Sequence, residues 1–228
     1  LVGEGGDAVR LVAERPLPDG QAIEVEAFGA RRDLHLPLPG RFQADNALLA
    51  AALAVGAGLP ADRAFAALPG LAGVRGRMER AVVLANGAAV YVDYAHTPDA
   101  LERLLAALRP HTAGRLHVLF GAGGDRDPGK RPLMGRAAAA GADRVWITDD
   151  NPRSEDPGAI RAAVLAACPG AVDAGAREAA IAAALEALEP GDVLAVAGKG
   201  HESGQEIAGV VHPFDDVSVV RRLAGAAP

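Results

Sequence analysis

The chain has 228 residues, of which 50% are hydrophobic and 23% are charged, and this composition indicates a soluble globular protein with one large or two modest domains. Its formal net charge of −6 argues against a nucleic-acid partner, because nucleic-acid binding relies on clustered surface cations. Cys168 is the only cysteine, which excludes an internal disulfide and a cysteine-based zinc site, and fits a reducing cytoplasm.

The first block of the chain predicts short antiparallel strands followed by two helices. Residues 8–38 alternate polar and apolar side chains between glycine and proline breakers. Helices are expected at about 44–57 and 61–68. The apolar stretch 47–59 is well short of the ~20 residues that span a bilayer, so no membrane insertion is expected. Glycines and a proline at 68–76 mark a linker.

The first ten residues lack an initiator methionine, a basic region and a cleavage signal. We therefore expect the sequence to be an interior part of a longer protein.

From about residue 77 the pattern changes to alternating strands and helices. Strands are predicted at 81–84, 89–94, 115–120, 144–148, 171–174 and 193–197. One helix should start after Thr97, an N-cap followed by Pro98, and another after Ser154, an N-cap followed by two acidic residues. Two apolar stripes mark the buried faces of these helices, namely Leu101, Leu104, Leu105 and Leu108 in one and Ile160, Val164 and Cys168 in the other. The alternation predicts an α/β fold with a mostly parallel sheet covered by helices on both faces.

Three of the predicted strands end in loops marked by glycine or aspartate, at 120–132, 148–157 and 195–203. In an open parallel sheet such loops meet at one edge, where ligands bind. Only two of the 23 basic residues are lysines, and Lys130 and Lys199 both lie within these loops. This placement favours a role for a compact ammonium group, which arginine does not supply.

The first loop partly matches a nucleotide phosphate loop, through Gly124, Gly129 and Lys130. Residue 131 is arginine instead of the serine or threonine that would bind magnesium, and two aspartates within the loop would repel a phosphate. A plain glycine turn explains the pattern better than a phosphate loop does. The mixed charges from 125 to 131 suit a small zwitterion.

The second loop presents polar side chains on a turn that Pro152 stiffens. Its local pattern also fits a helix-capping turn with a surface arginine. An arginine held by a rigid turn, here Arg153, is suited to bidentate recognition of a carboxylate. The third loop contains Gly198 and Gly200 around Lys199, which allow the backbone to approach a ligand closely, although a plain turn would have the same pattern.

The histidines do not indicate a metal site. His96 follows a predicted strand, where a histidine is more often a structural hydrogen-bonding residue than a base. The remaining histidines show no ligand spacing, and we assign no metal to the chain.

Six segments occur in one order along the chain: GRFQADNALLAAALAVGAGLP, GVRGRMER, VYVDYAHTPDAL, FGAGGDRDPGKRPLMG, TDDNPRSEDP and AGKGHE. Together they resemble the Mur ligases of peptidoglycan synthesis. Within that family they are most similar to the ligases that add meso-diaminopimelate to UDP-N-acetylmuramoyl-L-alanyl-D-glutamate.

The resemblance implies two domains. Residues 1–75 would be the C-terminal part of a central ATP-binding α/β domain, and residues 76–228 a Rossmann-like domain that binds the incoming amino acid. Asn46, Arg77 and Asp93 match residues near ATP, with Asp93 reaching the ribose, while Gln43 stands where the family usually has asparagine. The matches to the diaminopimelate pocket are Arg126, Asp150, Asn151, Pro152, Arg153, Gly198 and Glu202.

The family reaction phosphorylates a substrate carboxylate with ATP, and the amine then attacks the acyl phosphate with loss of phosphate. The resemblance places the magnesium ligands and catalytic residues upstream of residue 1, so we expect no catalytic residue in this chain and no turnover by it alone. A cytoplasmic monomer is expected. Two alternatives stay open: a lysine-adding or polyglutamate-type ligase, and a stand-alone amino-acid-binding module.

Overall fold

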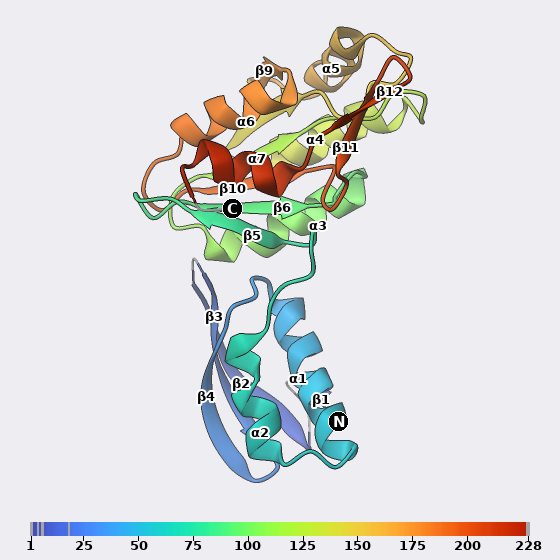
Figure 1. The fold of residues 1–228 in the computed structure, drawn as a ribbon. Helices are drawn as coiled ribbons and strands as arrows, with labels where there is room; N and C mark the ends of the chain where they lie inside the picture. The colour runs from blue at the N-terminus through green and yellow to red at the C-terminus, as the bar shows by residue number, and fades with distance from the viewer. Residues whose placement is uncertain (1, 4, 6, 18, 227–228) are drawn as a thin grey trace. The chain divides into compact units, whose positions relative to one another are not determined.

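The computed structural model describes residues 2–3, 5, 7–17 and 19–226 (Figure 1). The chain divides into two compact units, Leu1–Gly73 and Val74–Pro228. Each unit has a sheet and a hydrophobic core of its own. Within the described residues, no helix has the length and apolar character needed to cross a membrane.

The first unit combines a four-stranded sheet with two helices. Its strands are β1 (Val2–Gly3), β2 (Val9–Leu17), β3 (Gly20–Ala27) and β4 (Ala30–Leu36), which follow this order across the sheet. The antiparallel pairing predicted for this block is confirmed for β2, β3 and β4, and β1 adds a short parallel pairing to β2. Helices α1 (Arg41–Gly56) and α2 (Ala61–Ala66) and the 3₁₀ turn η1 (Leu68–Gly70) complete the unit.

The core of this unit follows from residue periodicity. Alternate residues of β3 are buried, among them Ile23 and Val25, and they pack with Ala47, Leu48 and other small or branched side chains of α1. Helix α1 begins at Arg41, before the predicted start at 44, and α2 ends at Ala66, before the predicted end at 68.

The second unit is built on a six-stranded sheet. In sheet order the strands are β5 (Glu79–Val83), β6 (Ala89–Asp93), β10 (Val193–Ala197), β7 (Leu116–Phe120), β8 (Arg144–Thr148) and β9 (Val172–Gly175). Only β5 is antiparallel to its neighbour, and the other five strands are parallel. The mostly parallel α/β fold predicted from the sequence is therefore confirmed.

Helices cover both faces of this sheet (Figure 1). One core joins the sheet to α3 (Pro98–Leu108), α4 (Lys130–Gly141) and α5 (Pro157–Leu165), and the opposite core joins it to α6 (Arg177–Glu186) and α7 (Asp216–Leu223). The two predicted apolar stripes lie in the first of these cores. A 3₁₀ turn, η2 (Arg109–His111), follows α3, and β11 (Gly204–Ile207) and β12 (Val210–Pro213) form a separate hairpin.

Helix α5 does not start where the sequence predicts. Its N-cap is Asp156, whose side chain accepts a hydrogen bond of 2.7 Å from the Ala159 amide, and Pro157 is the first helical residue. The hydroxyl of Ser154 instead donates to Asp125 in the neighbouring loop, at 2.6 Å. The prediction of Ser154 as N-cap was wrong because a closer aspartate–proline pair supplies both the cap and a fixed φ.

Candidate functional site

The three marked loops follow β7, β8 and β10, which are adjacent parallel strands, and so they meet at the carboxyl edge of the sheet. Glycines allow the loop backbones to approach one another. A Cβ atom on Gly124 would lie 2.0 Å from the Pro152 carbonyl oxygen, and one on Gly198 would lie 2.8 Å from Oδ2 of Asp150. The site therefore depends on glycine at both positions for steric reasons.

A pocket of about 250 Å³ opens between these loops. It is lined by Tyr94, His96, Gly121, Gly123, Arg126, Lys130, Asp150, Asn151, Arg153, Gly198 and Glu202. The lining contains every residue assigned from the sequence to the amino-acid pocket except Pro152. A larger groove of about 740 Å³ lies at the amino ends of β7, β8 and β9, but ligands of open α/β sheets bind at the carboxyl ends.

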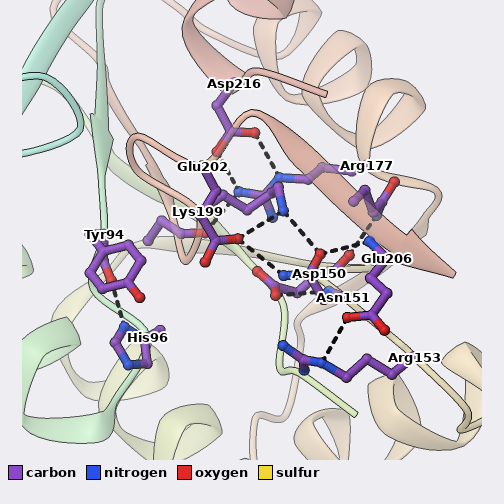
Figure 2. A network of polar contacts seen from close by, with 12 residues as sticks. Tyr94, His96, Asp150, Asn151, Arg153, Arg177, Lys199, Glu202, Glu206 and Asp216 are labelled. Atoms are coloured by element: carbon purple, nitrogen blue, oxygen red, sulfur yellow. Dashed lines mark hydrogen bonds and ion pairs between the residues drawn. The ribbon is translucent and has the colours of Figure 1, made fainter. Parts of the chain in front are cut away.

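Asn151 connects the second loop to the third and to the hairpin (Figure 2). Its Oδ1 accepts hydrogen bonds from Nζ of Lys199 at 3.1 Å and from the Glu206 amide at 3.0 Å, and its Nδ2 donates to Oε2 of Glu202 at 3.1 Å. The side chain is thus engaged on both its oxygen and its nitrogen. Asn151 therefore contributes to the pocket by holding Lys199, Glu202 and the backbone of Glu206 in place.

Lys199 is fully buried beneath the same pocket. Its ammonium donates to Asn151 and, at 3.2 Å, to Oε2 of Glu202, so that the buried cation forms an ion pair with a residue of the pocket lining. A buried charge requires such a partner because desolvation is costly. The compact ammonium inferred from the sequence is therefore a structural group at this position, because it holds Asn151 and Glu202 in place. Glu202 lines the pocket.

Asp150 brings a carboxylate to the pocket from the end of the second strand. It is 9% exposed, and its Oδ1 accepts from the Asn151 amide at 2.8 Å. Its Oδ2 is buried and accepts no hydrogen bond from the described residues. Asp150 lines the pocket, so its negative charge would attract a bound cationic group.

A second buried ion pair lies behind this carboxylate. Nε and Nη2 of Arg177 donate to the two carboxylate oxygens of Asp216, both at 2.8 Å, and Nη2 also donates to the Ala197 carbonyl at 2.9 Å. Both side chains are fully buried. Burial alone would lower the pKa of Arg177, but the pairing with Asp216 outweighs it and the pKa is raised.

Arg153 extends its guanidinium along the opposite wall. Nη1 donates to the Gly124 carbonyl at 2.8 Å, and Nε lies 3.2 Å from Oε2 of Glu206. The residue has a left-handed backbone with φ of 52°. Nη2 donates to no described residue, so this end of the guanidinium is available to a ligand carboxylate.

Two further cations lie at the pocket. Arg126 is exposed and donates from Nη1 to the Asp125 carbonyl at 3.0 Å. Nζ of Lys130 donates to the His96 carbonyl at 3.2 Å. Desolvation lowers the pKa of Lys130, although the nearby Asp150 and Asp127 carboxylates oppose this shift.

The loop that partly matches a phosphate loop in sequence is a turn held in place by contacts to the second loop. Nη2 of Arg131 contacts both carboxylate oxygens of Glu155, at 2.8 and 2.9 Å, and Arg131 is buried. Asp125 accepts from both the hydroxyl and the amide of Ser154. These contacts fix the first loop to the second. Arg131 therefore has a structural role in joining the two loops.

The residues assigned from the sequence to ATP fall in both units. Asn46 is exposed on α1 in the first unit. Arg77 and Asp93 lie in the second unit, where the Arg77 guanidinium is 5.1 Å from the centroid of the Tyr94 ring. The Asp93 carboxylate accepts from the amides of Met78 and Ala95, at 2.7 and 2.8 Å. Burial raises the pKa of Asp93, and these two hydrogen bonds lower it in part.

The described residues contain no group of three or more histidine, cysteine or acidic side chains placed to hold a metal ion. We derive no chemical step through a magnesium ion from this chain.

Sequence reasoning missed three residues that support the site: Arg177, Asp216 and Glu206. Arginine is rarely buried, and nothing in the local pattern of Arg177 distinguishes it from a surface residue. Glu206 lies on the hairpin, which the sequence analysis did not predict.

Comparison with known proteins identifies the family. Residues 76–200 match the model described as Mur ligase, glutamate ligase domain. The chain is 57% identical over 217 residues to the UDP-N-acetylmuramoyl-L-alanyl-D-glutamate–2,6-diaminopimelate ligase of Caulobacter vibrioides, covering 95% of this chain and 45% of that protein. The ligase of the same name from Bradyrhizobium diazoefficiens is 54% identical over 219 residues, covering 96% of this chain and 45% of that protein.

A solved structure of a ligase with this name has a TM-score of 0.80 and 36% identity, covering 97% of this chain and 46% of that one. Mycobacterium tuberculosis folylpolyglutamate synthase, solved with ADP and AMPPCP, has a TM-score of 0.64 at 22% identity, covers 97% of this chain and 49% of that one, and shares the fold. The chain spans less than half the length of the curated relatives it matches. Because the family model covers more than half of the chain, the chain belongs to the Mur ligase family.

Proposed function

We propose that residues 74–228 bind the incoming amino acid in a ligase that adds meso-diaminopimelate to UDP-N-acetylmuramoyl-L-alanyl-D-glutamate. The observation that carries this proposal is the charge pattern of the 250 Å³ pocket, where Arg126 and Arg153 face Asp150 and Glu202. Diaminopimelate has an ammonium and a carboxylate at each end. A pocket with both signs of charge on rigid loops complements such a molecule better than it complements lysine, which has one carboxylate.

The roles of individual residues follow from their geometry. Arg153 would bind the distal carboxylate, because its guanidinium is held by a stiff turn with Nη2 toward the pocket. Asp150 and Glu202 line the pocket with negative charge and would attract an ammonium group. Holding the amino acid at several points orients its reacting amine, which is the main catalytic contribution open to this chain.

ATP would supply the phosphoryl group that activates the carboxylate of the nucleotide peptide. Arg77 is the exposed cation suited to an anionic nucleotide, and we propose Asp93 and Asn46 as further contacts. We place the magnesium ligands and the nucleotide-peptide contacts in other parts of the protein, and propose that it acts as a monomer in the cytoplasm.

The proposal is tested by calorimetry of the chain with meso-diaminopimelate and with L-lysine. Arg153→Ala should weaken diaminopimelate binding by about 1.5 to 3 kcal/mol, the size of a charge-assisted hydrogen bond, and leave lysine binding nearly unchanged. Arg103→Ala is the matched control, because Arg103 pairs only with exposed Asp99 on α3. Equal discrimination between the two amino acids before and after Arg153→Ala would contradict the assignment.

A further inference from the structure

The hairpin of β11 and β12 contacts the second loop through one strand. The backbone of Arg153 pairs with β11, since its amide donates to the Glu206 carbonyl at 3.1 Å and its carbonyl accepts from the Ala208 amide at 2.8 Å. Nε2 of Gln205 donates to the Asp150 carbonyl at 2.6 Å. Together with the Glu206 amide bonded to Asn151, these contacts connect the hairpin to the turn through Gln205, Glu206 and Ala208.

The left-handed backbone of Arg153 needs this support. A non-glycine residue with a φ of 52° is strained by an amount on the order of 1 kcal/mol, and the strain persists only where surrounding contacts fix it. Both backbone hydrogen-bonding groups of Arg153 are engaged by the hairpin, its amide by Glu206 of β11 and its carbonyl by Ala208 of the turn. The hairpin therefore fixes the backbone of Arg153, and with it the position of the Cα atom from which the side chain extends.

Glu206 extends this control to the guanidinium. Its carboxylate lies at Nε of Arg153 (Figure 2). The Gly124 carbonyl accepts a hydrogen bond from Nη1. The Arg153 side chain is 20% exposed and that of Glu206 is 39% exposed. The ion pair at Nε and the hydrogen bond from Nη1 restrict the orientation of the guanidinium, and Nη2 donates to no described residue.

We propose that Glu206 is a positioning residue for amino-acid selectivity: it holds Arg153 in the orientation that receives the distal carboxylate. The inference rests on the proposed function. It adds Glu206, a residue that lies outside the ligand-binding loops. An exposed ion pair alone would contribute little to stability. Its effect here is on preorganisation, because an arginine that is already oriented loses less rotamer freedom when a carboxylate binds.

Binding measurements on the 228-residue chain test the functional part. Glu206→Ala should weaken meso-diaminopimelate binding about tenfold, within the range of one charge-assisted contact, and change L-lysine binding less than about twofold. Glu206→Gln keeps an oxygen that can accept from Nε, so its affinity for diaminopimelate should stay within about threefold of the original. Glu26→Ala is the matched control, because Glu26 forms an Arg–Glu pair with Arg10 in the first unit.

A second measurement separates positioning from ligand recognition. Exchange of the Arg153 Nε–H proton with water can be followed by NMR on the chain labelled with ¹⁵N-arginine, with the signal assigned by its loss in Arg153→Lys. We expect slow exchange in the original chain and in Glu206→Gln, which keeps an oxygen near Nε, and at least about tenfold faster exchange in Glu206→Ala, because the side chain that pairs with Nε is removed.

The two measurements have distinct outcomes. Unchanged exchange in Glu206→Ala would overturn the positioning role. Faster exchange with unchanged discrimination between diaminopimelate and lysine would overturn the selectivity role. If the original chain binds neither amino acid while the exchange results hold, the proposed function of the chain fails, the selectivity role fails with it, and the positioning of Arg153 by Glu206 stands.

Discussion

Two carboxylates that brace the first loop to the second carry lowered pKa values. Hydrogen bonds from the Ser154 hydroxyl and amide lower the pKa of Asp125, and the hydrogen bond from Arg131 lowers that of Glu155. Because each folded-state pKa lies below its unfolded value of about 4, both groups stabilise the fold above that pH. This stabilisation is lost as the pH falls through the folded pKa values, and the brace should loosen under acid conditions.

Removing one hydroxyl tests this interpretation. Ser154→Ala should raise the pKa of Asp125 toward about 4, because the largest stabilising contact to its carboxylate is deleted. The pKa is measured by NMR titration of the Asp125 carboxyl carbon. Thr97→Ala, which removes the N-cap of α3 instead, is the control and should leave that titration unchanged. An unshifted midpoint in Ser154→Ala would show that the hydroxyl does not set the pKa.

The three loops of the candidate site could be found from the sequence because they are marked by special residues, whereas the individual pocket residues were assigned through the resemblance to the Mur ligases. Glycines, a proline and isolated lysines identify the three loops, and the parallel sheet brings them together. The partners of each side chain could not be found in this way. Lys199 serves as a buried framework cation and Arg131 pairs with Glu155, and both facts depend on contacts between loops far apart in the sequence.

At the scale of elements, the strands and helices of the second unit were predictable because buried parallel strands are continuous apolar runs. The hairpin was not. Its strands are short, β12 is exposed throughout, and its turn is formed by Ala208 and Gly209, which have φ of 49° and 77°. Positive φ at both central residues is typical of a type I′ turn, but alanine–glycine lacks the asparagine or aspartate that usually signals it.

Helix α7 is tied to the site through a single buried ion pair, between Asp216 and Arg177. Asp216→Ala leaves an arginine buried without its partner, and we expect a loss of about 3 to 5 kcal/mol in the free energy of unfolding. Replacing both residues by apolar ones of similar volume, Arg177→Met with Asp216→Leu, should cost much less, because no buried charge remains. The free energies of unfolding of the single and the double variant are measured by urea unfolding monitored by circular dichroism.

The comparison of single and double variants decides what the ion pair does. A loss below about 1 kcal/mol for Asp216→Ala would mean that water reaches Arg177, contrary to its burial. A double variant that is stable but binds diaminopimelate poorly would show that the pair shapes the pocket through the Ala197 carbonyl, to which Arg177 donates.

At the scale of the whole molecule, the two units differ in how well they bury their apolar residues. Two cores enclose the six-stranded sheet of the second unit on both faces. The first unit has one core, and seven large apolar side chains are exposed among its described residues: Val12, Phe28, Phe42, Leu49, Leu53, Leu59 and Leu71. The second unit, which is about twice as long, has six: Val74, Val83, Leu133, Ile207, Val210 and Val211.

This difference predicts that the second unit folds alone and the first does not. A chain beginning at Val74 retains the Arg75–Asp215 ion pair of 2.5 Å and the close approach of Gly76 to the backbone of His201, where a Cβ would lie 2.2 Å from the amide nitrogen. Residues 74–228 should therefore melt cooperatively and keep the diaminopimelate affinity of the whole chain, measured by calorimetry. Residues 1–73 alone should be poorly ordered, with broad melting and binding of a hydrophobic dye. If residues 74–228 instead prove unfolded, the two cores are not sufficient by themselves, and the first unit must contribute to the stability of the second.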